Sequence, residues 1–455
     1  MELIKDIFSA GVVGQGGAGF PTHIKLNTDV EYLLINGLEC EPLLATDKHI
    51  MLHHASEVIK GITLVKQHLN ATAAYISIKN TNHDEITAMQ AAIDEAGAPI
   101  ILFKSTNYYP SGDEHMLVYD ITKRTVPAGG IPLDVGVVVN NIGTMQAIYH
   151  ATQGRSITHK FLTVTGHVQN PMVLKVPIGT SFETCITLAG GSTLDHFRLI
   201  NGGPLMGSIH EQDEIPSMFV TKTTSGIILI EPDRNFHAKL QDNHLLNTIN
   251  RAKAACIQCR LCTDMCPRYL IGHRLHPHKM MRVLGAAPTE GTSVAKWFLE
   301  QNQDLFQEAL TCCECGICEV YACPMDILPR QVNILIKNEF LRHGLKYQNT
   351  LGERPPHAMV EYRKIDPSRL MARMGLGNIM NTKPKQFHEP KVNQVHIALK
   401  QHIGKPALAV VNIGDTVSLG QLIAEADGNF SANIHASIAG TVQSITSHIH
   451  IEGSN

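Results

Sequence analysis

The stretch C-I-Q-C-R-L-C-T-D-M-C-P at residues 256–267 is the first of two cysteine runs in this chain. The second run, at residues 312–324, reads C-C-E-C-G-I-C-E-V-Y-A-C-P, and nine of the 11 cysteines fall in the two runs. The spacings are C-x2-C-x2-C-x3-C-P and C-x2-C-x2-C-x4-C-P. Thiolates at such spacings hold iron–sulfur clusters. Two runs therefore predict two 4Fe–4S clusters.

The fourth cysteine of each run is expected to bind the cluster of the other run, as in two-cluster ferredoxins. The expected ligands are Cys256, Cys259, Cys262 and Cys323 for one cluster, and Cys312, Cys315, Cys318 and Cys266 for the other. Cys313 is not expected to be a ligand, because its use would begin the run with C-x-C. Structural zinc is the alternative, but zinc requires neither a third cysteine three residues on nor the proline.

The chain has 455 residues and a formal net charge of -3. This length predicts two to four domains. No block of like charge suggests a nucleic-acid partner, and no apolar run approaches the ~18 residues of a transmembrane segment. The N-terminus, M-E-L-I-K-D-I-F-S-A, argues against a signal peptide. Clustered cysteines suit a reducing compartment, so we expect a cytoplasmic protein.

The first 157 residues alternate between predicted strands and helices. Such alternation predicts a parallel sheet with helices on both faces. The expected strands are Glu31–Ile35, Ala73–Ile78, Pro99–Phe103 and Val135–Val139. The expected helices are Ile4–Phe8, Leu52–Leu69, Asp84–Glu95, Asp113–Arg124 and Thr144–Thr152.

A glycine-rich loop lies near the N-terminus and reads G-Q-G-G-A-G-F-P from Gly14 to Pro21. It contains G-x-G-x-x-G, and Glu39 follows about twenty residues later, as in a dinucleotide-binding fingerprint. That fingerprint requires a strand directly before the glycines, whereas here an amphipathic helix precedes them. We therefore reject an ordinary Rossmann motif. The glycines still allow backbone N–H groups to approach a phosphate or a flat ring.

The stretch Gly14–Lys25 resembles the flavin-binding loop of the NADH-oxidising subunit of respiratory complex I and of RnfC proteins. The resemblance continues in N-G-L-E-C-E-P (Asn36–Pro42), Y-P-S-G-D-E (Tyr109–Glu114) and V-N-N-I-G-T (Val139–Thr144). In those families the matching elements surround one FMN and the nicotinamide of NADH. The resemblance therefore implies that this chain binds FMN and accepts electrons from NADH.

The resemblance also implies a set of cofactor-binding residues. They are Gly14, Gly16, Gly17, Gly19, Phe20, Lys25, Asn36, Glu39, Glu41, Gly112, Asp113, Glu114, Asn140, Asn141 and Thr144. Lys25 can meet the FMN phosphate as a point charge, and Phe20 can stack on a ring. A solvated loop is the alternative for Glu39 and Glu41. Gln15 and Leu38 depart from complex I, which has Arg and Asp there.

The remaining chain resembles three further domain types. The region after residue 157 looks like an SLBB β-grasp domain, and the long spacer between the cysteine runs suggests an α-helical two-cluster ferredoxin module. The C-terminal stretch resembles a barrel-sandwich hybrid domain without the modifiable lysine of a carrier. The expected boundaries are 1–157 for the FMN/NADH domain, 158–235 for the β-grasp domain, 240–345 for the cluster module, 346–392 for a linker and 393–455 for the sandwich domain.

This domain order resembles the PduS-type cobalamin reductases of propanediol-utilisation microcompartments. The resemblance implies electron transfer from NADH through FMN and two 4Fe–4S clusters to cobalamin, reducing cobalt from Co(III) or Co(II) to Co(I). It implies an adenosyltransferase and microcompartment shell proteins as partners, with the protein inside or at the shell. An RnfC-like electron shuttle to ferredoxin or another protein, without corrinoid chemistry, is the first alternative. An assembly subunit with structural clusters is the second. No D-x-H-x-x-G motif locates a corrinoid.

Overall fold

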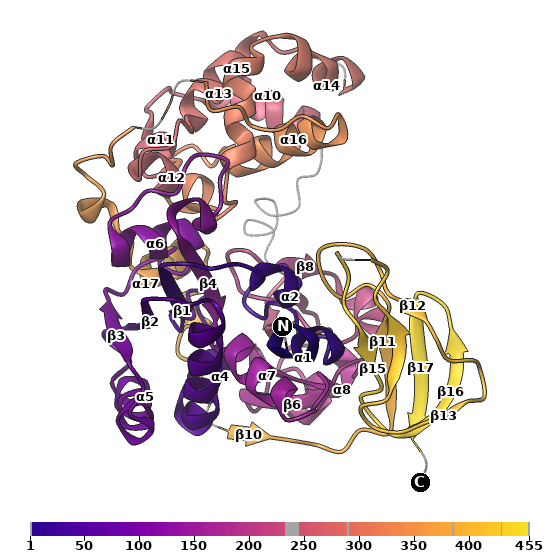
Figure 1. Cartoon of the computed structure of the whole chain (residues 1–455). Helices are drawn as coiled ribbons and strands as arrows, with labels where there is room; N and C mark the ends of the chain where they lie inside the picture. Colours follow the sequence, from indigo (N-terminus) through magenta and orange to yellow (C-terminus); the bar gives the residue numbers. More distant parts are fainter. Residues whose placement is uncertain are drawn as a thin grey trace. The chain divides into compact units, whose positions relative to one another are not determined.

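The chain forms two compact units in a computed structural model (Figure 1). The structure describes residues 2–232, 245–288, 291–350, 352, 354–384, 386–428 and 430–453. Unit 1 consists of Met1–Thr106, Gly136–Pro232 and Asn381–Asn455. Unit 2 consists of Asn107–Val135 and Asp233–Met380. The stretch Asn107–Val135 thus leaves the predicted flavin domain and packs with the cysteine runs.

A four-stranded parallel sheet with the order β3-β2-β1-β4 is the centre of the first domain of unit 1. Its strands are β1 (Tyr32–Asn36), β2 (Ala73–Lys79), β3 (Ile100–Ser105) and β4 (Val137–Asn141). Leu33, Leu34 and Ile35 are all fully buried, because helices cover both faces of the sheet. The parallel sheet predicted from the alternating pattern is confirmed.

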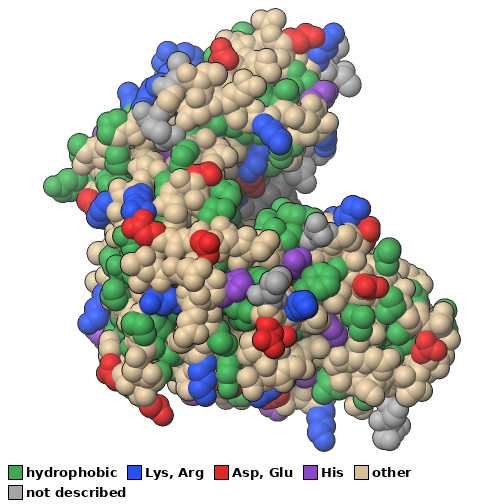
Figure 2. Space-filling view, in the orientation of Figure 1, with side chains coloured by type: hydrophobic (Ala, Val, Ile, Leu, Met, Phe, Trp, Pro, Cys, Tyr) green, Lys and Arg blue, Asp and Glu red, His purple; other side chains and the backbone are tan. Residues whose placement is uncertain are grey.

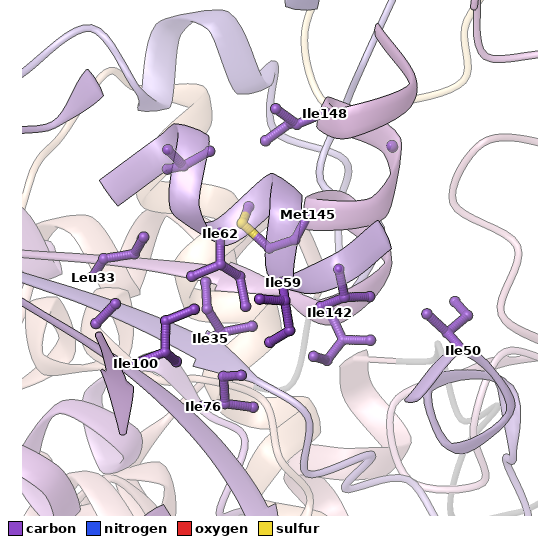
Figure 3. Packing of buried hydrophobic residues seen from close by; sticks show 14 of the residues in the cluster. Leu33, Ile35, Ile50, Ile59, Ile62, Ile76, Ile100, Ile142, Met145 and Ile148 are labelled. Atoms are coloured by element: carbon purple, nitrogen blue, oxygen red, sulfur yellow. The ribbon is translucent and has the colours of Figure 1, made fainter. Parts of the chain in front are cut away.

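The helices of this domain pack on the sheet through aliphatic side chains. They are α1 (Glu2–Ser9), α2 (Thr22–Lys25), α3 (Thr46–His53), α4 (Ala55–His68), α5 (His83–Ala96) and α7 (Ile142–Thr152). Figure 3 shows Ile59 and Ile62 of α4 against Met145 of α7 in the main core. At Gly61 a Cβ atom would lie 2.0 Å from the Met145 carbonyl oxygen, so close packing of α4 and α7 requires glycine. The single helix expected at Leu52–Leu69 is in fact two, separated at His54.

The β-grasp region of unit 1 is a six-stranded sheet with the order β10-β6-β5-β9-β7-β8, covered by α8. Its elements are β5 (His159–Gly166), β6 (Met172–Pro177), α8 (Phe182–Leu188), β7 (Arg198–Asn201), β8 (Ser208–His210), a 3-10 turn (Gln212–Ser217) and β9 (Gly226–Ile230). Strand β10 (Gln386–His388) pairs in parallel with β6. The sequence predicted only a linker and one helix there, because a three-residue edge strand carries too little pattern.

The C-terminal domain consists of two small sheets, β11-β17-β16-β13 and β12-β14-β15, around one apolar core. The strands are β11 (Gln394–Ala398), β12 (Leu408–Ala409), β13 (Thr416–Val417), β14 (Leu422–Glu425), β15 (Ile434–His435), β16 (Gly440–Ile445) and β17 (His448–Gly453). Leu408, Ile413 and Leu419 remain exposed on its surface, and Figure 2 shows hydrophobic side chains on the face in view.

Unit 2 is helical, as expected for the cluster module. Its α-helices are α6 (Glu114–Thr122), α10 (Leu245–Ala255), α11 (Leu261–Asp264), α12 (Pro267–Leu270), α13 (Pro277–Val283), α14 (Gly291–Glu300), α15 (Gln303–Phe306), α16 (Pro329–Arg342) and α17 (Pro367–Arg373). Short 3-10 turns lie at Pro132–Val135, Leu284–Ala286, Gln307–Thr311, Glu361–Arg363 and Gly377–Ile379. Asn302, at φ +56°, separates α14 from α15. None of the described helices has both the length and the apolar character that a bilayer span requires.

Candidate functional site

Four thiols from both cysteine runs surround one cavity in unit 2. Cys256, Cys259 and Cys262 of the first run line it together with Cys323 of the second. The pKa of Cys262 is raised to about 12, mainly by burial and further by these neighbouring thiols. Four clustered thiolates, two of them buried, need a compensating positive charge, which ferric and ferrous iron provide. The donor set therefore fits an iron–sulfur cluster.

A second group contains five thiols. Cys266 of the first run lies with Cys312, Cys313, Cys315 and Cys318, close enough for their charges to interact. Burial raises the pKa of Cys312 to about 11. Within the described residues, no three His, Cys, Asp or Glu side chains converge on a single metal ion. The thiols therefore form two groups, and the last cysteine of each run lies in the group of the other run.

The two runs repeat the same backbone conformation. In the first, Gln258 and Arg260 have positive φ angles of 58° and 68°. In the second, Glu314 and Gly316 have φ angles of 60° and 79°. These residues lie two and four positions after Cys256 and after Cys312, so the repeat aligns those two cysteines. If Cys313 were aligned with Cys256 instead, the positive φ angles of the two runs would no longer coincide.

The longer last gap of the second run has a local cause. Residues Cys318–Ala322 form a π-helical turn, whereas the first run has an ordinary helical turn at Leu261–Asp264. A π turn accommodates one more residue than an α turn. The extra residue is therefore absorbed before Cys323, which reaches the first thiol group.

The first thiol group includes an exposed thiol, whereas the thiols of the second group are buried or half-buried. Cys259 is exposed, whereas Cys266, Cys315 and Cys318 are buried. Hydrophobic side chains at the rim of the first group are also exposed, with Ile257 at 60%. Only the first group thus presents a thiol directly to the surface.

The stretch Asn107–Val135 holds the inner thiol group in place. Tyr109, which is 2% exposed, donates its hydroxyl to the carbonyl oxygen of Cys315 over 2.9 Å. Asp113 begins α6 by accepting from the backbone N–H groups of His115 and Met116. Its other oxygen lies 2.7 Å from the guanidinium of buried Arg268. Three expected cofactor residues, Gly112, Asp113 and Glu114, therefore belong to the unit that carries the thiols.

A buried ion pair lies beside the second run. The Arg330 and Glu319 side chains approach to 2.6 Å and are 6% and 0% exposed. A Cβ atom on Gly316 would lie 3.2 Å from the Arg330 guanidinium. Burial raises the pKa of Glu319, while Arg330 opposes this rise. Local charge of this kind is one means by which a protein sets a cluster potential.

In unit 1, the carboxyl ends of β1 and β4 bring three expected residues together. These strands are adjacent, with Asn36 opposite Asn141 and Ile35 opposite Asn140. Ligands of parallel sheets collect at such carboxyl ends. The Asn140 side-chain nitrogen is buried and has no hydrogen-bond partner among the described residues. An unpaired buried amide is costly, so this donor fits a ligand.

The glycine loop lies against the start of α7. The Gln15 N–H donates to the Thr144 hydroxyl over 3.1 Å, and Asn141 caps the helix by accepting from the Gly143 N–H. A Cβ atom on Gly16 would lie 3.0 Å from the Asn141 side chain, whereas Gly17 has open space. The loop therefore needs glycine for close approach and leaves room beside it. The amphipathic helix α1 precedes this loop, as the sequence predicted.

The two acidic residues of the E-C-E-P stretch are held by the backbone. Glu39 accepts from the N–H groups of Asp47 and Lys48, at 3.0 and 3.4 Å. The pKa of Glu39 is raised to about 7, mainly by burial and further by the Asp47 carboxylate. Glu41 accepts from the Leu205 N–H over 2.9 Å, in the β-grasp loop N-G-G-P-L-M-G. Both acidic side chains are thus anchored by backbone N–H groups and only partly exposed to solvent.

The C-terminal domain contacts the glycine loop at two points. The Ile403 N–H donates to the Ala18 carbonyl oxygen over 2.8 Å. The ring of Phe20 packs edge to face on Phe430, with centroids 5.2 Å apart. Phe20 is thus engaged with another protein ring, and Lys25 ends helix α2 just beyond the loop. These partners lie 385 and 410 positions away in sequence, so no local pattern could have indicated them.

Two charged residues of this site were not predicted from the sequence. Lys160 of β5 donates to the Gln15 side chain over 2.9 Å, and Asp47 accepts from the Asn141 amide over 2.8 Å. Lys160 is the second residue of β5, near the end of the strand, where a lysine suggests solvent. Asp47 lies in the first turn of a helix, where an acidic residue is common. Neither position carries a distinctive sequence signal.

Family models match four stretches of the chain. They are described as the Nuo51 FMN-binding domain at residues 7–150, the SLBB domain at 161–208, a 4Fe-4S dicluster domain at 255–328 and the RnfC barrel sandwich hybrid domain at 380–455. The fold classes predicted for these regions are confirmed. In particular, the glycine loop and both thiol groups fall within models named for FMN and iron–sulfur clusters.

Curated relatives match much of the chain. The cobalamin reductase PduS of Salmonella typhimurium is 37% identical over 448 residues, which cover 98% of this chain and 95% of the relative. A component of the proton-translocating ferredoxin:NAD(+) oxidoreductase complex of Clostridium ljungdahlii is 34% identical over 68% of this chain and 60% of that component. A solved NAD+-reducing [NiFe]-hydrogenase matches 76% of this chain and 63% of its own, with 17% identity and a TM-score of 0.49. By its near full-length similarity, the chain belongs to the family of the cobalamin reductase PduS.

Proposed function

We propose that the chain is an NADH-dependent reductase of cobalamin. It would pass electrons from NADH through FMN and two 4Fe–4S clusters to cobalamin, reducing Co(III) or Co(II) to Co(I) for regeneration of adenosylcobalamin. The observation that carries this proposal is the 37% identity to a cobalamin reductase over 98% of the chain. The crossed grouping of the thiols supports the two clusters.

FMN, when bound, exchanges two electrons with a nicotinamide and single electrons with an iron–sulfur cluster. In unit 1 the glycine loop and Lys25 are proposed to receive the phosphate and ring of FMN. The amides of Asn36, Asn140 and Asn141 would donate to flavin oxygen and nitrogen atoms. The residues proposed to bind FMN or NADH remain Gly14, Gly16, Gly17, Gly19, Phe20, Lys25, Asn36, Glu39, Glu41, Gly112, Asp113, Glu114, Asn140, Asn141 and Thr144.

Glu39 has the chemistry to hold a proton near the strand ends. With a pKa of about 7, its carboxyl group is partly protonated at neutral pH. The two backbone N–H groups that it accepts from fix its orientation. A carboxyl group that titrates near the working pH is suited to proton exchange with a bound cofactor.

The eight cysteines proposed as iron ligands form two sets of four. They are Cys256, Cys259, Cys262 and Cys323 in one set and Cys266, Cys312, Cys315 and Cys318 in the other. The repeated positive φ angles after Cys256 and Cys312 support Cys312, not its neighbour Cys313, as the ligand. Because the first set includes an exposed thiol, we propose that electrons leave through it.

The proposed partners and location follow from the family. An adenosyltransferase would alkylate the Co(I) product, and microcompartment shell proteins would enclose or anchor the reductase. The protein is accordingly proposed to act in the cytoplasm, inside or at the shell of a bacterial microcompartment.

The test is an anoxic assay with the reconstituted full-length protein. NADH and cob(III)alamin are added with an adenosyltransferase and ATP, and adenosylcobalamin is measured with the flavin and cluster absorbance. Formation of adenosylcobalamin that requires both NADH and this protein is the expected result. Bleaching of the flavin and clusters without any cobalt product would overturn cobalamin as the acceptor. No bleaching at all would favour an assembly subunit with structural clusters.

The second candidate is an NADH-linked electron shuttle to ferredoxin or another protein. The observation that favours it is the exposed hydrophobic rim of the first thiol group, formed by Ile257 and Met325. Such a rim suits a transient protein contact. Faster oxidation of the reduced protein by ferredoxin than by cobalamin, measured by stopped flow, would favour this candidate.

A further inference from the structure

Lys160 is a buried cation from the β-grasp region that reaches into the candidate flavin site. It is 4% exposed, and it lies at the start of β5, in register with Val176 of β6. Its Nζ atom donates to Gln15 Oε1 over 2.9 Å. Gln15 belongs to the glycine loop, although 145 positions separate the two residues in sequence.

The surroundings of Lys160 are other residues of the same site. The Gln15 side-chain oxygen lies 3.1 Å from the position of a Cβ atom on Gly143, at the start of α7. The Gln15 N–H donates to Thr144. Asp47, whose carboxylate attracts Lys160, accepts from the Asn141 amide over 2.8 Å. One network thus joins Lys160 to the glycine loop, the end of β4 and the start of α7.

The charges in this network are poorly compensated. Burial lowers the pKa of Lys160 to about 8, and the Asp47 carboxylate only partly opposes this. Burial also raises the pKa of Asp47, in spite of the Asn141 amide and Lys160. A buried ion pair gains little net stability unless further groups satisfy both partners. The N–H groups at the start of α7 and the ammonium group together favour an anion.

We propose that Lys160 is a cofactor-binding residue that supplies positive charge to an anionic part of FMN. The inference rests on the proposed function, because it presupposes FMN in unit 1. Two parts of FMN carry negative charge: the phosphate, and the ring once it is reduced. Both share the same requirement for a nearby cation, and the experiment separates them.

The test compares Lys160→Met, which removes the charge, with Lys160→Arg, which retains it. Dissociation constants for FMN and riboflavin are measured with the full-length apo-protein by flavin fluorescence, and the flavin midpoint potential is measured by anoxic spectral titration. Lys175→Met is the matched control, because Lys175 lies on neighbouring strand β6 and pairs with Glu389 at the surface. Thermal unfolding of each apo-protein reports folding separately.

Lys160→Met is expected to weaken FMN binding at least tenfold or to lower the flavin midpoint potential. The FMN dissociation constant of Lys160→Arg is expected to stay within about threefold of the wild-type value. Weaker FMN binding with unchanged riboflavin binding identifies the phosphate. A lower potential identifies the reduced ring. Unchanged FMN affinity and potential in Lys160→Met would overturn the inference.

A second variant separates FMN binding from a purely structural interaction between the charges of Lys160 and Asp47. Asp47→Asn removes the competing carboxylate and can keep the bond to the Asn141 side chain. If Lys160 serves FMN, this variant binds FMN as tightly as the wild type or more tightly. If both variants lose FMN and thermal stability to the same extent, the pair is structural and the inference fails. If the wild-type protein does not bind FMN, the proposed function fails instead.

Discussion

The ammonium group of Lys222 donates to the carbonyl oxygen of Gly11 over 2.7 Å and to that of Asn433 over 2.6 Å. Lys222 is 2% exposed and lies just before β9 of the β-grasp region, whereas Gly11 precedes the glycine loop and Asn433 belongs to the C-terminal domain. Gly11 has φ +69°, and a Cβ atom there would lie 2.2 Å from the Asn433 carbonyl oxygen. One side chain therefore joins three domains of unit 1 beside the glycine loop.

Replacing Lys222 should loosen the C-terminal domain on the glycine loop. Lys222→Met fills the same space but leaves two buried carbonyl oxygens without this donor, at a cost of about 1–3 kcal/mol. Hydrogen exchange of the full-length protein should show faster exchange at the Ile403 N–H, which bonds to Ala18. The matched control is Lys405→Met, because Lys405 lies exposed in the C-terminal domain and pairs with Asp427. Equal exchange in both variants would contradict the role assigned to Lys222.

The pH dependence of unit 1 should include the titration of Glu39. Its folded-state pKa of about 7 lies above the ordinary glutamate value of 4.5, so the folded state binds the proton more tightly. The stability from this proton is full below about pH 4.5 and declines as the pH rises to about 7. The whole change is on the order of a few kcal/mol.

Glu39→Gln should remove this decline while keeping one acceptor oxygen. Infrared spectra of the apo-protein should show a protonated carboxyl band that disappears between about pH 6 and 8 in the wild type and is missing in Glu39→Gln. Thermal unfolding of the variant should depend less on pH over the range of about 5–7. Glu95→Gln, at an exposed position on α5, serves as the control and should behave like the wild type. An unchanged carboxyl band in Glu39→Gln would assign the proton to another group.

The central strands of the flavin domain, β1 and β4, could be predicted because each is a short apolar run that is buried on both faces. Leu33, Leu34 and Ile35 form such a run, and the structure buries all three. The thiol groups could be predicted because most ligands of a cluster lie a few residues apart at a characteristic spacing. Proline after each fourth cysteine added to this signal.

The parts that could not be predicted depend on contacts between distant segments. Lys160 and Gln15 are far apart in sequence, and a lysine near the start of a strand ordinarily faces water. Likewise, nothing local shows that Tyr109, predicted within the flavin domain, would bond to the backbone of Cys315. Such residues become visible only when the packing of the domains is known.

The buried pair of Glu319 and Arg330 should influence the potential of the second cluster. Glu319→Gln keeps the shape of the side chain and leaves the Arg330 cation beside Gly316 without its carboxylate. The added positive charge favours the reduced cluster, so its midpoint potential should rise by on the order of 50 mV. Redox titration followed by electron paramagnetic resonance measures this shift. Glu300→Gln, which breaks the exposed pair with Lys296, should leave both cluster potentials unchanged; a fall in potential in Glu319→Gln would contradict the electrostatic account.

The choice between Cys312 and Cys313 can be decided by single substitutions. The Cys312 sulfur accepts from the Glu314 N–H at 3.4 Å and from the Asn333 amide at 3.6 Å, and such bonds stabilise a metal-bound thiolate. Cys313→Ser should therefore retain the iron and sulfide of both clusters, whereas Cys312→Ser should lose one cluster or leave it unstable. Iron and acid-labile sulfide analysis of the anoxically purified protein, with paramagnetic resonance of each reduced variant, measures this. Cys40→Ser, outside both runs, is the control; loss of iron in Cys313→Ser together with full retention in Cys312→Ser would reverse the assignment.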